Sequence, residues 1–252
     1  MFCFSFLRIS LKYSIIIPTL NEEKLLPGLI NQLSDPHLKE KYNYEIIISD
    51  GGSTDKTIEK VIEQSDIIKV HTAKQRQNIA QGRNEGARFA NGEILIFING
   101  DIILPGVVPF FNYLENNFTF THYAAMTCKV KVFKEEEKIS DILFHSVYNF
   151  YFYLLNLFGV GMGRGECQVI RKKYFDMVNG NNSLLTAGED FDLFKRISRH
   201  GKILFAKDLC IYESPRRYRK IGYCGVTWLW IKNSISIIFK NKSLSKEWEQ
   251  VR

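Results

Sequence analysis

Short apolar runs alternate with segments of helical spacing through the first hundred residues, and this alternation restricts the fold more than any other feature. Continuous apolar runs are typical of buried strands, whereas apolar residues three or four positions apart are typical of amphipathic helices. Strands are predicted at Tyr13–Ile17, Glu45–Ser49, Ile67–Val70 and Glu93–Ile98, and helices at Glu22–Leu33, Lys56–Gln64 and Ile79–Ala90. The order predicts an α/β fold in which a parallel sheet carries helices on both faces.

Polar clusters directly follow three of these strands, at Thr19–Glu22, Asp50–Asp55 and Asn99–Asp101. Ligands of parallel sheets bind outside the carboxyl ends of the strands. One cluster alone is weak support for a site, because each is also good turn chemistry, with Ser53 or Thr54 able to cap the next helix. Three clusters at one edge of a sheet predict a binding site.

The pattern is less regular after Asp101, and no repeat or low-complexity linker interrupts it. We expect one domain over residues 1–213 and a C-terminal extension over residues 214–252. The glycine-rich segment Gly159–Gly165 is expected to be a mobile loop, either near a substrate or an inert connector. Helices are predicted at Pro105–Asn116, Ile142–Phe158 and Glu189–His200, and strands at Ala124–Phe133, Gln168–Ile170 and Ile203–Ala206.

The net charge of +7 is concentrated in the extension. Residues 214–252 contain nine Lys and Arg residues and only two acidic residues, so this segment alone carries a charge of +7. Such a segment attracts phosphate-bearing partners or an anionic membrane, and a solvated basic face is equally compatible. Trp228, Trp230 and Trp248 suit a membrane interface or a packed core. No nucleic-acid-binding motif accompanies the charge, so we expect no nucleic-acid partner.

The five cysteines include no CxxC pair, which predicts reduced thiols in a cytoplasmic protein and no cysteine zinc site. The N-terminal segment lacks the features of a signal peptide. The sequence contains no uninterrupted run of about 20 apolar residues, so no transmembrane helix is predicted. The aromatic stretch Ile142–Phe158 is compatible with a lipid-linked acceptor, with helix packing or with a homodimer. The expected location is cytoplasmic, with a peripheral contact on the inner face of the membrane left open.

Acidic residues in three clusters carry the chemistry. Asp101 stands at a strand end behind a glycine, where Mg²⁺ could bind together with substrate phosphates. Asp50 follows a strand and could accept hydrogen bonds from a nucleobase or ribose. Glu189 and Asp190 open a predicted helix behind Gly188, where the helix dipole favours ionised carboxylates. An ionised Asp190 could remove a proton from an attacking hydroxyl.

Together these motifs resemble the family 2 glycosyltransferases of GT-A fold. The resemblance covers about Tyr13 to Gly201, and its motifs stand in the family's order, with further likeness in YESPRRYRKIGY. It implies a GT-A (Rossmann-like), mostly parallel central sheet with helices on both faces. The motifs that carry it are SIIIPTLNEEKLLPGLI, EIIISDGGSTDKT, GRNEGARFANGEILIFINGD and GEDFDLFKRI.

The resemblance also implies a role for each matching residue. Asp190 corresponds to the catalytic base and Glu189 to its neighbour near the acceptor. Asn99 and Asp101 correspond to the ends of the Asp-x-Asp motif, which holds Mg²⁺ or Mn²⁺, and Asp50 to the acid that contacts the base, usually uracil. The implied donor-binding residues are Pro18, Thr19, Asn21, Glu22, Asp50, Ser53, Arg83, Asn99, Arg216 and Arg217.

Two positions depart from the family's pattern. Asn99 replaces the first acid of Asp-x-Asp, and its amide oxygen can bind a metal or ribose but brings no charge. Some relatives carry a metal-binding histidine near Glu213, which could substitute for it or face solvent.

The expected activity is inverting transfer of a sugar from a nucleotide-diphosphate sugar, with a UDP-sugar expected, to a hydroxyl of a sugar or lipid-linked acceptor in cell-surface polysaccharide or glycolipid synthesis. The alternatives are a nucleotidyltransferase of similar fold and a membrane-surface binding protein with a degenerate transferase core. The first is disfavoured because no Gly-rich, Lys-bearing phosphate loop follows the first strand.

Overall fold

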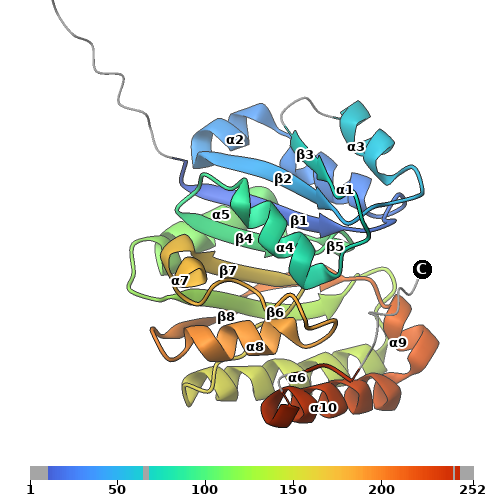
Figure 1. Ribbon diagram of the computed structural model, residues 1–252, viewed down its shortest axis with the longest axis vertical. Coiled ribbons are helices and arrows are strands. Elements are labelled where there is room, and N and C mark those ends of the chain that lie inside the picture. Colours follow the sequence, from blue (N-terminus) through green and yellow to red (C-terminus); the bar gives the residue numbers. More distant parts are fainter. Residues whose placement is uncertain (1–10, 65–67, 241, 245–252) are drawn as a thin grey trace, which may run out of the picture.

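The computed structural model describes residues 11–64, 68–240 and 242–244, and the predicted strand start Ile67 and the aromatic Trp248 lie outside them (Figure 1). The predicted strands and helices of the first half follow in the predicted order, and one further helix, at Pro36–Tyr42, precedes the second strand. The strands are β1 (Tyr13–Thr19), β2 (Tyr44–Asp50), β3 (Ile68–Thr72), β4 (Ile94–Ile98), β5 (Ile102–Ile103), β6 (Ala125–Val132), β7 (Cys167–Arg171) and β8 (Ile203–Glu213). The α-helices are α1 (Leu26–Leu33), α2 (Pro36–Tyr42), α3 (Thr57–Gln64), α4 (Ile79–Arg88), α5 (Val107–Leu114), α6 (Ile139–Leu157), α7 (Lys172–Met177), α8 (Glu189–Ile197), α9 (Arg216–Ile221) and α10 (Tyr223–Lys240), and a π-helix covers Glu115–Thr119.

One sheet runs through the molecule with the strand order β3-β2-β1-β4-β7-β6-β8-β5. Strands β3, β2, β1 and β4 are parallel neighbours, and β6 and β8 form a further parallel pair. Strand β7 runs antiparallel between β4 and β6, and β5 is antiparallel to β8. The predicted α/β architecture with a mostly parallel sheet is confirmed.

Alternation along the strands builds a core on each face of the sheet. Ile15 and Ile17 of β1 face the larger core with α1 and α5, whereas Ile16 packs into the second core with α4, α7 and α8. These side chains are fully buried. Because both faces are covered, the strands read as continuous apolar runs in the sequence.

Several element boundaries differ from the prediction. Helix α1 begins at Leu26 rather than Glu22, because the residues before it form turns that follow β1. Neither Ser53 nor Thr54 caps α3; the Asp55 carboxylate accepts the amide hydrogen of Thr57 at 3.0 Å. Strand β8 extends to Glu213, well beyond the predicted Ala206, and so delivers that residue to the site.

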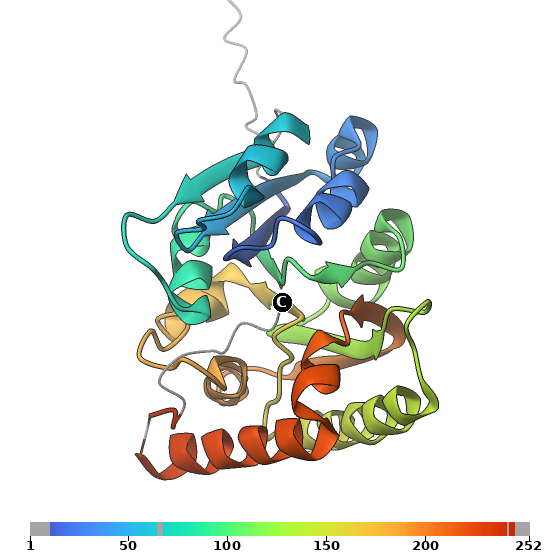
Figure 2. The ribbon, with the colours of Figure 1, turned by 90° about the vertical axis from the view of Figure 1, so that its right-hand side faces the viewer.

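The described part of the C-terminal extension forms the helices α9 and α10, and α10 packs against α6 (Figures 1 and 2). Trp230 of α10 lies 6.0 Å from the ring of Phe144 and 5.0 Å from that of Tyr148, both on α6. In the described residues, no helix combines the length and apolarity that a membrane span requires. The domain boundary at Ser214 stays a prediction.

Candidate functional site

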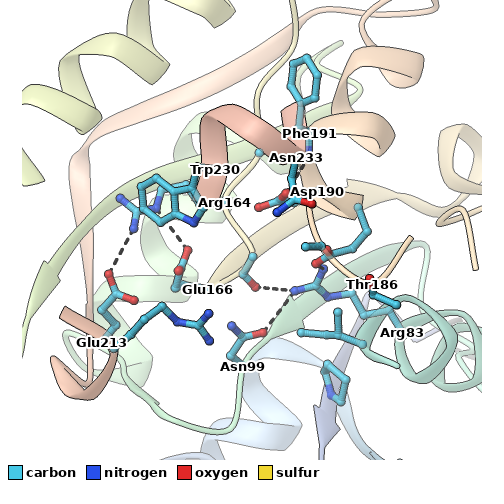
Figure 3. A pocket seen from close by; sticks show the side chains of 18 of the residues that line it. Arg83, Asn99, Arg164, Glu166, Thr186, Asp190, Phe191, Glu213, Trp230 and Asn233 are labelled. Carbon is cyan, nitrogen blue, oxygen red and sulfur yellow. Dashed lines mark hydrogen bonds and ion pairs between the residues drawn. The ribbon is translucent and has the colours of Figure 1, made fainter. Parts of the chain in front are cut away.

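A pocket of about 970 Å³ opens beyond the carboxyl ends of β1 and β4 and reaches to α6, α8 and α10 (Figure 3). Strand ends supply one wall, the N-terminus of α8 another, and α9 and α10 close the far side. Most of the predicted site residues line it. They are Pro18, Thr19, Glu22, Arg83, Asn99, Asp101, Glu189, Asp190, Glu213, Arg216 and Arg217.

The other predicted donor residues, Asn21, Asp50 and Ser53, are not among the lining residues and bind one another instead. The carboxylate of buried Asp50 accepts hydrogen bonds from the Ser53 amide at 3.1 Å and the Ser53 hydroxyl at 2.5 Å. The Ser53 hydroxyl oxygen accepts the Asn21 amide hydrogen at 2.8 Å. This network ties together the loops after β1 and β2, and a base-binding role for Asp50 stays a prediction.

A fully buried guanidinium joins three segments at the floor of the pocket. Arg83 of α4 donates to a Glu189 carboxylate oxygen at 2.7 Å, to the Gly165 carbonyl at 2.8 Å and to the Asn99 amide oxygen at 3.2 Å. The pairing compensates the charge of Glu189, which is also buried. Arg83 therefore fixes the first residue of α8 relative to the end of β4.

Asp190 lies beside this pair in the first turn of α8, behind Gly188, whose φ of 76° suits glycine. Burial and the neighbouring Glu189 charge raise the pKa of Asp190 to about 7, although Arg83 opposes the shift. The Phe191 amide donates to one Asp190 carboxylate oxygen at 2.8 Å. A carboxylate that titrates near neutral pH is suited to accept a proton from a substrate hydroxyl.

Arg216 of α9 bridges two carboxylates at the strand edge. Its terminal nitrogen lies 3.0 Å from an Asp101 oxygen and 3.1 Å from both Glu22 oxygens. All three side chains remain partly exposed to the pocket. The cluster combines a guanidinium with two carboxylates, the kinds of group that bind phosphate oxygens and divalent cations, respectively.

A second ionised cluster, which the sequence did not identify as a unit, lies across the pocket (Figure 3). Arg164 approaches Glu166 and Glu213 at 3.2 Å each, and the Tyr218 hydroxyl donates to Glu213 at 2.7 Å. Burial and nearby Glu166 raise the pKa of Glu213 well above its ordinary value. Partial burial opposes ionisation of Glu166 as well, yet the Arg164 charge holds the pKa of Glu166 below its ordinary value. In the sequence, the one sign of this cluster is the pair of oppositely charged residues, Arg164 and Glu166, on either side of Gly165.

His145 of α6 approaches the same cluster, with its Nε2 atom 3.7 Å from Glu213. Burial and the charge of Arg164 lower the pKa of His145 to about 3, so the imidazole is neutral at physiological pH. From the sequence, a histidine near Glu213 was expected only as a feature of relatives. Here the fold brings one to Glu213 from a helix about seventy residues away.

Two glycines of the segment Gly159–Gly165 have a packing role. A Cβ atom on Gly163 would lie 2.4 Å from the Phe194 ring, and one on Gly161 would lie 2.5 Å from the Phe194 carbonyl oxygen. Asn156 holds the same segment to α6 by bonding both the amide and the carbonyl of Met162. Glycine is therefore required for the close approach of this segment to α8.

Comparison with known proteins decides the family. The profile of the Glycosyl transferase family 2 matches residues 14–178, about two thirds of the chain. The chain belongs to glycosyl transferase family 2. The predicted family membership is thus confirmed, and the matched region contains Arg83, Asn99 and Asp101.

Curated relatives are identical to this chain at about a third of the aligned positions, and each alignment covers only part of the sequence. A dolichyl N-acetyl-alpha-D-glucosaminyl phosphate 3-beta-D-2,3-diacetamido-2,3-dideoxy-beta-D-glucuronosyltransferase of Methanococcus voltae is 33% identical over 135 residues, 51% of this chain and 37% of that protein. The UDP-Glc:alpha-D-GlcNAc-diphosphoundecaprenol beta-1,3-glucosyltransferase WfgD of Escherichia coli is 35% identical over 92 residues, 36% of this chain and 35% of that protein. The matches therefore span little more than a third of either relative.

Solved structures show the same fold. The mannosyltransferase PcManGT of Pyrobaculum calidifontis, in complex with GDP-Man and Mn²⁺, superposes with a TM-score of 0.66 at 19% identity, covering 84% of this chain and 58% of that one. TarS of S. aureus with UDP-GlcNAc gives a TM-score of 0.60 at 17% identity, covering 81% and 58%. The predicted GT-A fold is confirmed.

The residues present fit a divalent ion only in company with a ligand. In the part of the chain that the structure describes, no three His, Cys, Asp or Glu side chains gather into a metal site. Asp101 offers one carboxylate that faces the pocket, and Asn99 an amide oxygen. Mg²⁺ binds through few protein carboxylates when substrate phosphates supply the remaining oxygens. The donor set therefore suits an ion that enters with a diphosphate.

Proposed function

We propose that this protein transfers a sugar from a nucleotide-diphosphate sugar, with UDP-sugars the first candidates, to a hydroxyl of a sugar or lipid-linked acceptor with inversion at the anomeric carbon. The position of Asp190 in the pocket wall, in the first turn of α8 beside the Arg83–Glu189 pair, carries the proposal. The pKa of this carboxylate is raised to about 7, so it can accept a proton from an acceptor hydroxyl bound in the pocket. The family and the fold support the same reaction class.

In the proposed mechanism, Asp190 accepts the proton of the acceptor hydroxyl as that oxygen attacks the anomeric carbon. The bond from that carbon to the diphosphate breaks in the same displacement, so no covalent sugar intermediate forms. Arg83 and Glu189 hold the N-terminus of α8 in place, which keeps the Asp190 carboxylate aimed at the acceptor. Burial of the carboxylate raises its basicity at the pH of the reaction.

The departing diphosphate is proposed to lie beside Asp101, Arg216 and Arg217. Arg216 would move from Glu22 and Asp101 toward the phosphate oxygens, because guanidinium binds both kinds of anion in the same geometry. Mg²⁺ or Mn²⁺ held by Asp101, with Asn99 and Glu213 as the other predicted ligands, would neutralise charge on the leaving group. Asp101 is the principal candidate because its carboxylate is partly exposed in the pocket, whereas Glu213 is buried and pairs with Arg164 and Tyr218.

Donor binding is testable without knowing the acceptor. A nucleotide sugar that binds the folded state should raise the melting temperature, by about 5–10 °C at roughly a hundredfold excess over its dissociation constant. UDP- and GDP-sugars should be screened with and without Mn²⁺, and the rise should be larger with Mn²⁺. If no nucleotide sugar shifts the melting temperature under either condition, the proposed function is wrong.

Asp101→Asn tests the metal assignment in the same assay. The variant should keep its melting temperature without ligand but lose the increment that Mn²⁺ adds, because the principal carboxylate ligand is gone. Asp208→Asn is the control, since Asp208 is an exposed acid that does not line this pocket. An undiminished Mn²⁺ increment in Asp101→Asn, equal to that of the control, would exclude Asp101 as the main ligand.

A further inference from the structure

Helix α6 is inverted relative to an ordinary surface helix. Its buried positions are mostly polar, being Asp141, His145, Asn149 and Asn156 together with Phe152. Its opposite face is apolar and exposed to solvent. That face consists of Ile139, Ile142, Leu143, Val147, Phe150, Tyr151, Leu157 and Phe158, each at least 45% exposed. A surface helix in water normally shows the reverse pattern.

Three of the four buried polar side chains, those of Asp141, Asn149 and Asn156, have hydrogen-bond partners within the protein, whereas neither ring nitrogen of His145 makes a hydrogen bond to any residue that the structure describes. The Asn149 amide group donates to the Val130 carbonyl at 3.0 Å and accepts the Val130 amide hydrogen at 3.1 Å. Asp141 pairs with Arg219 and accepts from the Tyr223 hydroxyl at 2.7 Å. The polar side of α6 therefore holds the helix to β6, α9 and α10, and the apolar side contributes nothing to the core.

Helix α10 adds a second exposed apolar stripe beside the first. Trp228, Ile231 and Ile235 follow one another at helical spacing and are 58%, 43% and 52% exposed, respectively. The two helices contact each other, since the Tyr148 hydroxyl donates to Thr227 at 3.0 Å, and both views show them together on one side of the molecule (Figures 1 and 2). The exposed apolar residues of α6 and α10 are called the α6–α10 face below.

The α6–α10 face adjoins the mouth of the pocket. Val147 and Tyr151 of α6 and Ile231 and Ile235 of α10 are exposed and also line the pocket. An apolar molecule lying on this face would reach the same cavity that holds Asp190. Exposed apolar patches of this kind mark sites that bind another protein, a membrane or a ligand.

The charges around the face favour a lipid bilayer as the binding partner. From Ile142 to Phe158 the chain has no Asp, Glu, Lys or Arg, and the only charged residues of α10 are Lys232 and Lys240. The Lys232 ammonium lies 5.0 Å from the Trp228 ring centre, an arrangement of aromatic and basic side chains that suits a lipid headgroup region. A second copy of this chain would bring lysines against lysines, whereas an anionic bilayer attracts them.

We propose that the α6–α10 face rests on the surface of an anionic lipid bilayer and that the acceptor enters the pocket from that surface as a lipid-linked molecule. The apolar side chains would insert between the lipid headgroups while Lys232 contacts their phosphates. The pocket mouth then faces the membrane. The identity of the acceptor rests on the proposed function, but docking on the bilayer does not.

Vesicle co-flotation without nucleotide tests the docking. The probe is vesicles made from equal parts of phosphatidylcholine and phosphatidylglycerol, with pure phosphatidylcholine for comparison. The variant Leu143→Ser/Phe150→Ser/Trp228→Ser removes exposed apolar side chains that are not pocket residues. We expect the wild-type protein to float with the anionic vesicles, and the triple variant to partition about tenfold or more weakly.

The matched control carries the same number of exposed apolar-to-serine changes on other elements: Ile62→Ser/Phe120→Ser/Met177→Ser, at positions 58%, 81% and 55% exposed. It should float like the wild type. Equal flotation of the triple variant and the wild type would overturn the proposal. So would equal binding to neutral vesicles, or a wild-type dimer in sedimentation velocity that dissociates in the triple variant.

The two proposals can fail separately. The triple variant should keep the nucleotide-sugar melting shift, because none of its positions lines the pocket. Loss of that shift together with loss of flotation would indicate a damaged fold, which circular dichroism detects, and Leu143→Gln/Phe150→Gln would then replace it. A protein that floats but binds no nucleotide sugar would contradict only the proposed function.

Discussion

Replacing Asp190 with asparagine is expected to lower the transfer rate by about 10²–10⁴-fold, the contribution of a positioned general base. The amide is nearly the same size as the carboxylate but cannot accept the acceptor proton. Donor binding should persist, since the proposed diphosphate contacts lie at Asp101, Arg216 and Arg217. The measurement is steady-state transfer, together with the nucleotide-sugar melting shift of the same variant.

Asp192→Asn is the matched control for this variant. Asp192 lies on the same helix but pairs with Arg196, with a shortest separation of 2.6 Å, and is not among the pocket residues. Its replacement should leave the transfer rate within a fewfold of the wild type. If Asp190→Asn kept the wild-type rate while Asp192→Asn lost it, the base would be misassigned.

The raised pKa of Asp190 also predicts a pH profile. Because the carboxyl must be ionised to act as a base, the transfer rate should fall below a pH of about 7 in the wild type. The loss should follow the protonation of a single group. A profile in which the rate stays constant from pH 8 down to pH 5 would contradict the assignment.

Ionisation of Asp190 should lower the stability of the folded protein, although it raises the transfer rate. The folded-state pKa of Asp190, about 7, exceeds the ordinary value of 3.8, so its contribution to stability is full below about pH 4 and is lost as pH rises through about 7. Asparagine stays uncharged at every pH and avoids that loss. Asp190→Asn should therefore melt at a higher temperature than the wild type at pH 8, and at a similar temperature near pH 4.

The sequence predicted the strand-end part of the site because that part follows from local patterns. Each of β1, β2 and β4 is a continuous apolar run, and the polar residues after it must lie at one edge of a parallel sheet. Pro18, Glu22 and Asp101 meet in the pocket for that reason. The first turn of α8 was predicted equally well, because its acids follow a glycine and precede an apolar stripe.

The remaining part depends on contacts between distant segments. Nothing local to Arg164 indicates that it meets Glu213, since β8 had to continue past Ala206 to bring the two together. The aromatic composition of α6 was visible, but its inversion was not. Which face of α6 is buried depends on hydrogen bonds from Asn149 to β6 and from Asp141 to α9 and α10. Such pairings become apparent only once the chain is folded.

Removing the Arg83 guanidinium should have the largest effect on stability. Arg83→Met leaves Glu189 buried without its partner, and the loss of one member of a buried ion pair costs about 3–5 kcal/mol. Urea unfolding measures the loss. Arg88→Met is the control, because Arg88 lies on the same helix, is 76% exposed and pairs only with Glu85 at the surface, so its removal should cost under about 1 kcal/mol.

A double-mutant cycle separates the pair from simple loss of packing. Arg83→Met/Glu189→Met removes both charges together, so it should be less destabilised than the sum of the two single variants. Strict additivity would mean that the two side chains do not stabilise each other.

Arg83 also lowers the pKa of Asp190, in opposition to burial and Glu189, so its removal should move the pH profile of transfer to higher pH. A purely structural role for Arg83 would reduce stability and leave that profile where it was, and this difference links the buried pair to the proposed base.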